Sequence, residues 1–191
     1  PANLLDLDEE EKLRLKSFCL LSSKPMLYAC NLKEEEIIDP SANDKLVAFE
    51  QWANQQQDAT CCAISAKMEE ELSELEEAEA KEYLESMGVS DSGVTSLIKA
   101  CYDLLGLASY LTAGEKEARA WTFTKGMTAP QCAGVIHTDF EKAFIKAEVV
   151  SFDELIEAGS MQAARESGKL RLEGKEYLFA DGDVALFKCN A

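Results

Sequence analysis

Two short polar segments carry side chains of the kind that bind a heterocyclic base. The first, Asn31-Leu-Lys-Glu34, directly follows the apolar run Met26–Cys30, and the second, Ser65-Ala-Lys67, ends a later apolar run. An amide both donates and accepts hydrogen bonds, and a carboxylate accepts them from N–H groups. At neighbouring strand ends, Asn31 would tie two loops together while Glu34 accepts from the edge of a base. The spacing therefore indicates a purine pocket.

The first segment differs from the N-K-x-D motif with which GTPase-type P-loop folds hold guanine. Glu34 is one methylene longer than the usual Asp, and Leu32 replaces the usual Lys. Adenine offers an N6 donor and an N1 acceptor, so a bidentate carboxylate suits it poorly. Backbone groups, the amide of Asn31 and apolar contact from Leu32 suit adenine better. The other base-contacting loop of such folds, in which a backbone N–H meets the base, is matched by Ser65, Ala66 and Lys67.

The Asn31 segment and the later run of glutamates can also be explained without a ligand. Asn31 can cap a helix, with Glu34 as an ordinary surface acid. The nine glutamates between residues 69 and 85 are typical of a solvated helical face, and a cation site is the alternative. The sequence alone leaves these alternatives open. The base site is favoured because Asn31-Leu-Lys-Glu34 and Ser65-Ala-Lys67 each follow an apolar run, in the order expected for such a site.

The aromatic residues of one predicted strand and the histidine invite a functional interpretation but are better explained by their structural roles. Trp121 and Phe123 alternate on one face of a predicted strand, which favours core packing over the stacking of bases. His137 is the only histidine. We expect it at a helix end, hydrogen-bonded near Thr138 and Asp139, rather than in a catalytic role.

Phosphate-binding and metal-binding patterns are missing from the sequence. There is no G-x-x-x-x-G-K-[ST] segment to cradle phosphates. No C-x-x-C pair and no Cys–His cluster has zinc spacing. We therefore expect no catalytic residue and no metal ligand in this chain, so that the chain alone does not hydrolyse a nucleotide.

The first half of the chain alternates strands and helices. A strand buried on both faces is predicted at Met26–Cys30, then an acidic loop at Glu34–Glu36, and a second strand ends near Ser65. The predicted helices are 6–21, 41–57, 67–87 and an amphipathic one that ends at Gly106. A strand–helix–strand–helix order implies parallel pairing in an α/β layer, which binds ligands at the carboxyl ends of its strands.

After Gly106 the pattern changes to short strands around a helix. The predicted elements are a strand at Arg119–Thr124, a helix at Ala129–Phe144, a strand at Ile145–Ser151, a short helix at Phe152–Ala158 and a hairpin at Glu176–Cys189 with Asp181-Gly182 at its turn. Short strands arranged around a helix in this way predict a small α+β domain of grasp type.

The net charge is −17 and unevenly distributed: residues 1–106 carry 9 basic and 23 acidic residues, and residues 107–191 carry 10 and 13. A protein that binds duplex DNA is normally basic, so that class is excluded. No apolar run reaches the roughly 18 residues of a membrane helix, which excludes a membrane-spanning protein. The odd number of cysteines, most within apolar runs, indicates a reducing compartment, the cytoplasm. The densest basic stretch contains Arg165, Lys169, Arg171 and Lys175. This stretch is either a solvated face of the protein or a contact with RNA or the ribosome.

From Lys24 onward the sequence resembles the YchF subfamily of Obg-like P-loop ATPases and GTPases. The matching runs are strongest over Tyr110–Thr122, Ala129–Lys142 and Ala164–Gly182. The resemblance covers essentially the whole chain, as the C-terminal half of a longer protein. It implies a partial P-loop G domain followed by a TGS domain, a ubiquitin-like β-grasp. Residues 1–20 then correspond to a helix returning from a coiled-coil arm, 21–106 to the C-terminal part of the G domain and 107–191 to the TGS domain.

The resemblance also implies a function. The family's N-x-x-E element falls on Asn31 and Glu34, and its final base-contacting loop on Ser65-Ala-Lys67. It implies that ATP is accepted as well as or better than GTP, with Mg²⁺ held by residues outside this chain, and a role in translation. Two functions follow: part of a nucleotide hydrolase that supplies the base-recognition loops, or a docking module whose TGS domain binds a ribosome, RNA or a protein.

Overall fold

The computed structural model describes residue 2 and residues 5–56, 58–114 and 117–190. The chain divides into two units, Pro1–Leu105 and Gly106–Ala191. Each unit has its own sheet and its own helices, so each is described by itself.

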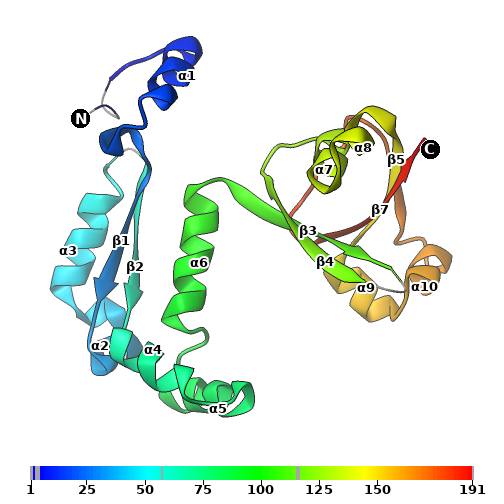
Figure 1. Ribbon diagram of the computed structural model, residues 1–191. Coiled ribbons are helices and arrows are strands. Elements are labelled where there is room, and N and C mark those ends of the chain that lie inside the picture. Colours follow the sequence, from blue (N-terminus) through cyan, green and yellow to red (C-terminus); the bar gives the residue numbers. More distant parts are fainter. Residues whose placement is uncertain (1, 3–4, 57, 115–116, 191) are drawn as a thin grey trace. The chain divides into compact units, whose positions relative to one another are not determined.

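The first unit is built on two parallel strands, β1 (Met26–Asn31) and β2 (Ala59–Ile64). The pairing runs in register from Met26↔Ala59 to Asn31↔Ile64. Figure 1 shows α3 (Asp44–Ala53) on one side of these strands and α6 (Gly93–Leu104) on the other. A parallel pair needs a crossover between its strands, and α3 lies within it. The predicted parallel α/β layer is confirmed.

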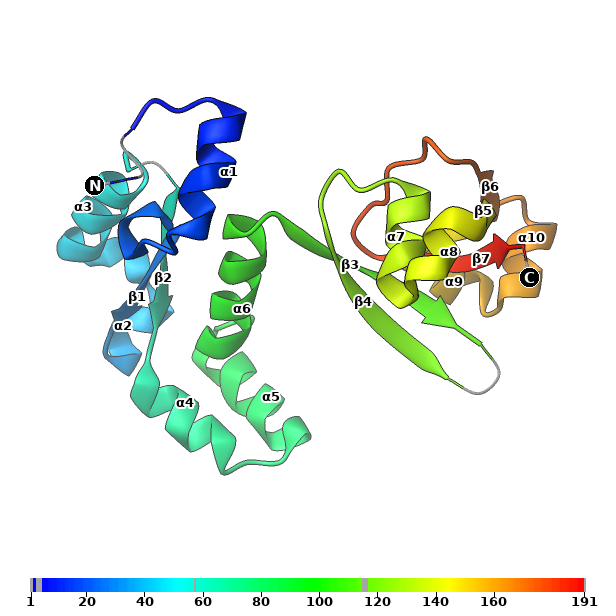
Figure 2. The same cartoon turned by 45° about the horizontal axis from the view of Figure 1, so that its top comes forward.

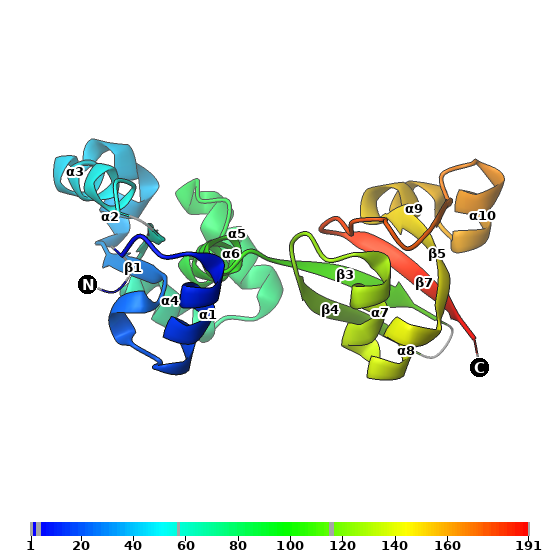
Figure 3. The ribbon, with the colours of Figure 1, turned by 90° about the horizontal axis from the view of Figure 1, so that it is seen from above.

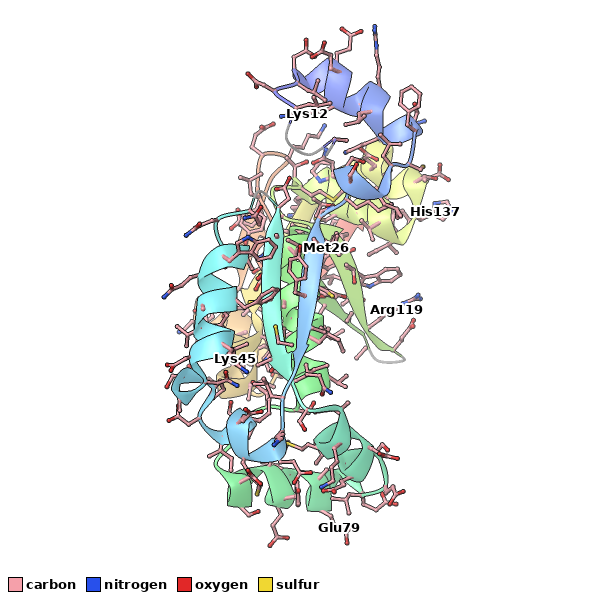
Figure 4. The ribbon with its side chains drawn as sticks, turned by 90° about the vertical axis from the view of Figure 1, so that its left-hand side faces the viewer. Lys12, Met26, Lys45, Glu79, Arg119 and His137 are labelled. Atoms are coloured by element: carbon pink, nitrogen blue, oxygen red, sulfur yellow. The ribbon has the colours of Figure 1, made fainter. Side chains whose placement is uncertain are left out.

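The remaining helices of this unit lie at both ends of the strands. They are α1 (Glu9–Ser17), the short 3₁₀ segments η2 (Leu21–Ser23) and η3 (Pro40–Ala42), α2 (Glu34–Ile38), α4 (Ala66–Ser73) and α5 (Glu77–Met87). Figure 2 shows α4 and α5 next to the lower end of α6. Figure 4 shows Met26 at the other end of β1, and Glu79 on α5 far from it. The carboxyl ends of β1 and β2 therefore face α2 and α4.

Two sequence predictions for this region are wrong. The strand at Met26–Cys30 is not buried on both faces; its residues are exposed or half-buried, because the described part of this unit has only two strands. The acidic segment Glu34–Glu36 is not a loop but the first turn of α2. The carboxylate of Glu36 accepts a hydrogen bond from the N–H of Lys33 at 3.0 Å. Acidic residues are also favoured in a first turn by the helix dipole.

The helix predicted over residues 67–87 is interrupted. Its first part is α4 and its second part is α5, and between them Glu76 takes an extended conformation. The N–H of Glu76 donates to the carboxylate of Glu79 at 3.4 Å, which starts a new helix. Helical composition alone does not reveal this break, because no Gly or Pro marks it.

Helix ends differ from prediction in two other places. The helix predicted over residues 6–21 is limited to α1, because Asp8 caps its start by accepting from the N–H of Glu11 at 2.8 Å. Beyond its end, Cys19 has a φ of 50°, which is incompatible with a continuing helix. The helix predicted over residues 41–57 is also shorter than expected, since α3 begins at Asp44 and ends at Ala53; the predicted last residue, Gln57, lies outside the described residues.

The described residues of the second unit form one five-stranded mixed sheet in the order β4-β3-β7-β5-β6. Its strands are β3 (Leu107–Ala113), β4 (Ala118–Thr124), β5 (Phe144–Ser151), β6 (Arg171–Glu173) and β7 (Asp183–Cys189). Its helices are α7 (Ala129–Ile136), α8 (Thr138–Ala143), α9 (Phe152–Ala158) and α10 (Met161–Glu166). β3 and β7 are parallel, and the other pairs are antiparallel. This is the predicted β-grasp.

The two faces of this sheet carry separate cores. Figure 3 shows α7 and α8 on one side and α9 and α10 on the other. On the α7 side Tyr110 is fully buried, with its ring centroid 5.2 Å from that of Phe179. Its hydroxyl donates to the carbonyl of Cys132 at 2.8 Å, so the buried polar group is satisfied. The smaller core under α9 and α10 contains Val150, Ala164 and Val184.

The predicted hairpin over Glu176–Cys189 is wrong. Only β7 is a strand there, and it pairs with β5 and β3 rather than with the segment before it. The carboxylate of Asp181 accepts from the N–H of Ser109 at 2.7 Å, which ties the preceding loop to β3. Gly182 has a φ of 78° and turns the chain, as an Asp-Gly pair indicates.

The helix predicted over Ala129–Phe144 is also two helices, α7 and α8. His137 separates them with an extended backbone, and its Nδ1 accepts from the N–H of Asp139 at 3.2 Å. The predicted role of His137 as a hydrogen-bond partner at a helix end is confirmed.

Candidate functional site

The two predicted base-site segments begin at the same rim of the first unit's sheet. Asn31 and Ile64 are paired as the last residues of β1 and β2. Just beyond them, the N–H of Leu32 donates to the carbonyl of Ile64 at 2.7 Å. Both strand arrows in Figure 1 point toward α2 and α4. Asn31 and Ser65 therefore lie side by side, as the sequence predicts.

The side chain of Asn31 joins the two loops. Its Oδ1 accepts a hydrogen bond from the N–H of Ala66 at 3.0 Å, across 35 residues of sequence. Ser65 is buried, and its hydroxyl caps α4 by accepting from the N–H of Met68 at 3.5 Å. Since the Ala66 N–H is used by Asn31, the N–H of Lys67 is the next backbone donor at this helix start.

The acid of the first segment is held by the lysine of the second. Oε1 of Glu34 lies 2.7 Å from Nζ of Lys67, which also lies 3.5 Å from Oε1 of Glu71. The close contact with the Glu34 carboxylate and its charge, together with the charge of Glu71, raise the pKa of Lys67. The rim therefore carries a fixed ion pair rather than an unpaired carboxylate.

A cavity of about 350 Å³ opens beside this ion pair, within the volume range of small-molecule sites. Its lining residues are Asn31, Leu32, Lys33, Glu34, Glu35, Ser65 and Lys67. Of the residues predicted for the base site, only Ala66 is not part of the lining. Lys33, Glu35 and the supporting Glu71 are missed by sequence reasoning, although the four-residue spacing of Lys67 and Glu71 was a usable signal.

A second tie holds the start of α6 against the same rim. The carboxylate of Glu69 accepts from the N–H of Gly93 at 2.6 Å. A Cβ at Gly93 would lie 3.0 Å from Oε1 of Glu69 and 3.3 Å from Cα of Ile64, closer than side chains normally approach. The glycine therefore allows α6 to pack closely on the end of β2, and no sequence motif points to it.

The basic stretch of the second unit is largely paired with acids of the same unit. Lys175 is exposed. The other three cations form the pairs Arg165–Glu148 at 2.8 Å, Lys169–Glu154 at 3.3 Å and Arg171–Asp183 at 3.3 Å. Pairing reduces the positive potential that this stretch can offer to an anionic partner.

The aromatic pair of β4 belongs to the core. Phe123 is buried, and Trp121 packs against the same cluster. The indole N–H of Trp121 donates to the hydroxyl of Thr112 at 2.9 Å, and the guanidinium of Arg119 lies 4.1 Å above its ring. The predicted preference for packing over base stacking is confirmed.

The described residues contain neither a metal-binding cluster nor a membrane-spanning helix. No group of three or more His, Cys, Asp or Glu side chains there is arranged to hold a metal ion. No helix in those residues combines the length and apolarity needed to cross a membrane.

Comparison with known proteins places the chain among close relatives. The family model YchF-GTPase_C, described as a protein of unknown function (DUF933), matches residues 107–190. Two curated relatives named Ribosome-binding ATPase YchF come from Bacillus subtilis (strain 168), 49% identical over 190 residues, and Escherichia coli O157:H7, 40% identical over 186 residues. The alignments cover 100% and 97% of this chain, but 52% and 50% of those proteins. The chain thus spans about half the length of the curated relatives it matches.

Solved structures of similar proteins match the fold of this chain. The Schizosaccharomyces pombe YchF GTPase matches with a TM-score of 0.78 and 35% identity, over 98% of this chain and 50% of that chain. A GTP binding protein from Pyrococcus horikoshii OT3 shares the fold, with a TM-score of 0.58 and 17% identity over 97% and 58% of the two chains. The long sequence match, the two-unit architecture and the solved relative together show that the chain belongs to the YchF family.

Proposed function

We propose that this chain forms the base-recognition part of the nucleotide site in a YchF-type protein that hydrolyses ATP, GTP or both. The observation that carries the proposal is the hydrogen bond from the Ala66 N–H to Oδ1 of Asn31, which holds two strand-end loops around one cavity. Ligands of open α/β sheets bind at such strand ends. The names of the relatives, ribosome-binding ATPase and GTPase, support a nucleotide as the ligand.

In this proposal the chain binds and orients the base, and the phosphate chemistry belongs to other parts of the protein. Asn31 keeps the two loops together, and Leu32 supplies apolar contact to the base. The N–H of Lys67 supplies a donor. The sequence has no phosphate-cradling loop, so the residues that hold Mg²⁺ lie outside this chain. When bound, Mg²⁺ neutralises the charge that develops on the phosphates.

The substitution Asn31→Ala in the whole protein tests the base site. It removes the bond to Ala66 and should weaken the binding of both ATP and GTP about fivefold to tenfold, the typical effect of one lost hydrogen bond. Asn54→Ala is the matched control, because Asn54 is exposed beyond the end of α3. The measurement is a titration of each variant with ATP and with GTP to obtain dissociation constants. If Asn31→Ala and Asn54→Ala bind both nucleotides with the same affinity, Asn31 is not part of a base site.

A second candidate function is docking by the second unit. We infer that residues 107–191 are a TGS domain that binds the ribosome or RNA, that residues 21–106 are the C-terminal part of a G domain, and that residues 1–20 return from a helical arm. The printed names of the relatives support ribosome association, which we propose takes place in the cytoplasm. Of the basic stretch, exposed Lys175 is the cation best placed for an external contact.

Cosedimentation of the whole protein with ribosomes at low and high salt tests docking. An electrostatic contact predicts that binding falls with salt and falls further in Lys175→Glu. Lys24→Glu, an exposed charge reversal in the first unit, is the control. Arg171 is unsuitable for this test because it pairs with the buried Asp183. Binding that ignores salt and survives Lys175→Glu counts against this surface.

A further inference from the structure

Four side chains connect α5 to the base site. The hydroxyl of Tyr83 donates to Oε2 of Glu71 at 3.1 Å, and Oε1 of Glu71 lies 3.5 Å from Nζ of Lys67. The same Nζ lies 2.7 Å from Oε1 of Glu34, at the start of α2. Lys67 therefore bridges two carboxylates, and the one on the base-site side is the closer.

This bridge decides what Glu34 can offer to a base. Guanine presents two neighbouring N–H donors, N1–H and the N2 amino group, and a carboxylate holds both by accepting with its two oxygens. Oε1 of Glu34 is buried and accepts no hydrogen bond from the described residues, and its close contact there is the ion pair with the ammonium of Lys67 at 2.7 Å. Only Oε2 is then available, so the two-oxygen contact with guanine is lost. Adenine does not present this pair of donors and loses little.

We propose that Lys67 is a specificity-determining residue whose ion pair with Glu34 withdraws the acid from the guanine edge and thereby favours adenine nucleotides. The inference rests on the proposed function, because it requires a purine in the cavity lined by Glu34 and Lys67. It assigns a role to the lysine of the Ser-Ala-Lys segment, whose sequence alone indicates only a backbone contact.

The surrounding charges keep the bridge in place. Glu34 and Glu71 both raise the pKa of Lys67, so its ammonium stays charged at neutral pH. Tyr83 orients Glu71 by its hydrogen bond. The Lys67 side chain is 71% exposed, however, so solvent screens the pair and the effect on affinity is modest.

The test measures dissociation constants of ATP and GTP for the whole protein and compares their ratio between variants. The ratio cancels any general effect of the lysine charge on the phosphates, which the two nucleotides share. Lys67→Met should shift the ratio toward GTP by about two- to fivefold, the range that an exposed ion pair supports. Lys81→Met is the matched control, because Lys81 forms an exposed pair with Glu85 on α5, at 3.9 Å. Glu71→Gln removes the competing negative charge and should leave the ratio unchanged or shift it toward ATP.

The outcomes separate this inference from the proposed function. A shift toward GTP in Lys67→Met, with Lys81→Met like the parent, supports the inference. If both nucleotides bind and the ratio in Lys67→Met is unchanged or moves toward ATP, the inference is overturned while the proposed function stands. If neither nucleotide binds to the unmodified whole protein, the proposed function falls and this inference falls with it.

Discussion

Replacing Asp183 should reveal how the second unit holds the long segment between β6 and β7. The side chain of Asp183 is 3% exposed and accepts three hydrogen bonds: from the Tyr177 hydroxyl at 2.7 Å, the Ala180 N–H at 3.0 Å and the Arg171 guanidinium at 3.3 Å. Asp183→Ala leaves these donors without their acceptor. The network also binds Arg171, which is why that residue contributes to stability more than to any external contact.

The expected loss follows from burial. Removing one partner of a buried ion pair costs about 3–5 kcal/mol, and the half-exposed Arg171 places this case near about 3 kcal/mol. For a domain of this size that corresponds to a fall in Tm of about 12 °C or more. Asp183→Asn keeps one oxygen, which can still accept from Tyr177 and Ala180. Its amide then faces Arg171, which can turn to water, so the loss should be about 1 kcal/mol.

Urea unfolding followed by tryptophan fluorescence measures these losses. The chain has two tryptophans, so a Trp52→Phe background leaves Trp121, which packs against the core of the second unit, as the reporter. Asp153→Ala, an exposed carboxylate in α9, is the control and should cost under about 1 kcal/mol. If Asp183→Ala unfolds within about 0.5 kcal/mol of this control, the buried network does not stabilise the unit and the reasoning fails.

Three further predictions concern pH, thiol reactivity and packing. Burial and a hydrogen bond to a neighbouring carboxylate raise the pKa of Tyr177 to about 12. The contribution of Tyr177 to stability is therefore complete below pH 10 and is lost as the pH rises from 10 to about 12. Urea unfolding midpoints of the parent and of Tyr177→Phe should differ below pH 10, and the difference should shrink between pH 10 and about 12. A disulfide-exchange reagent should label exposed Cys19 at least about tenfold faster than fully buried Cys132. Burial raises the pKa of the Cys132 thiol to about 12, so little reactive thiolate forms there. Equal labelling rates in mass spectrometry would contradict this packing. Gly93→Val should destabilise the first unit by about 1–3 kcal/mol because its side chain would crowd Glu69, and a thermal midpoint equal to the parent's would show that α6 does not pack as closely as described.

Local patterns predict much of the fold. Short apolar runs correctly predict the positions of β1 and β2, although β1 is not buried on both faces because the described part of this unit has only two strands. The amphipathic spacing before Gly106 correctly predicts α6. The breaks between α4 and α5 and between α7 and α8 are missed, since both depend on single backbone conformations inside otherwise helical sequences, although His137 is correctly expected at a helix end. The hairpin prediction is wrong because β7 finds its partners in strands far away in the chain.

The sequence by itself indicated that two polar segments follow two strands in a parallel arrangement, because a helix between two strands supplies the crossover that parallel pairing needs. It therefore placed Asn31 and Ser65 at one rim. Only the tertiary structure decided which groups meet there: the Ala66 N–H bonds to Asn31, and Lys67 pairs with Glu34. Such contacts join residues more than thirty positions apart. Residue type and periodicity say which face of an element a side chain occupies, but its partner depends on how the folded backbone brings those faces together.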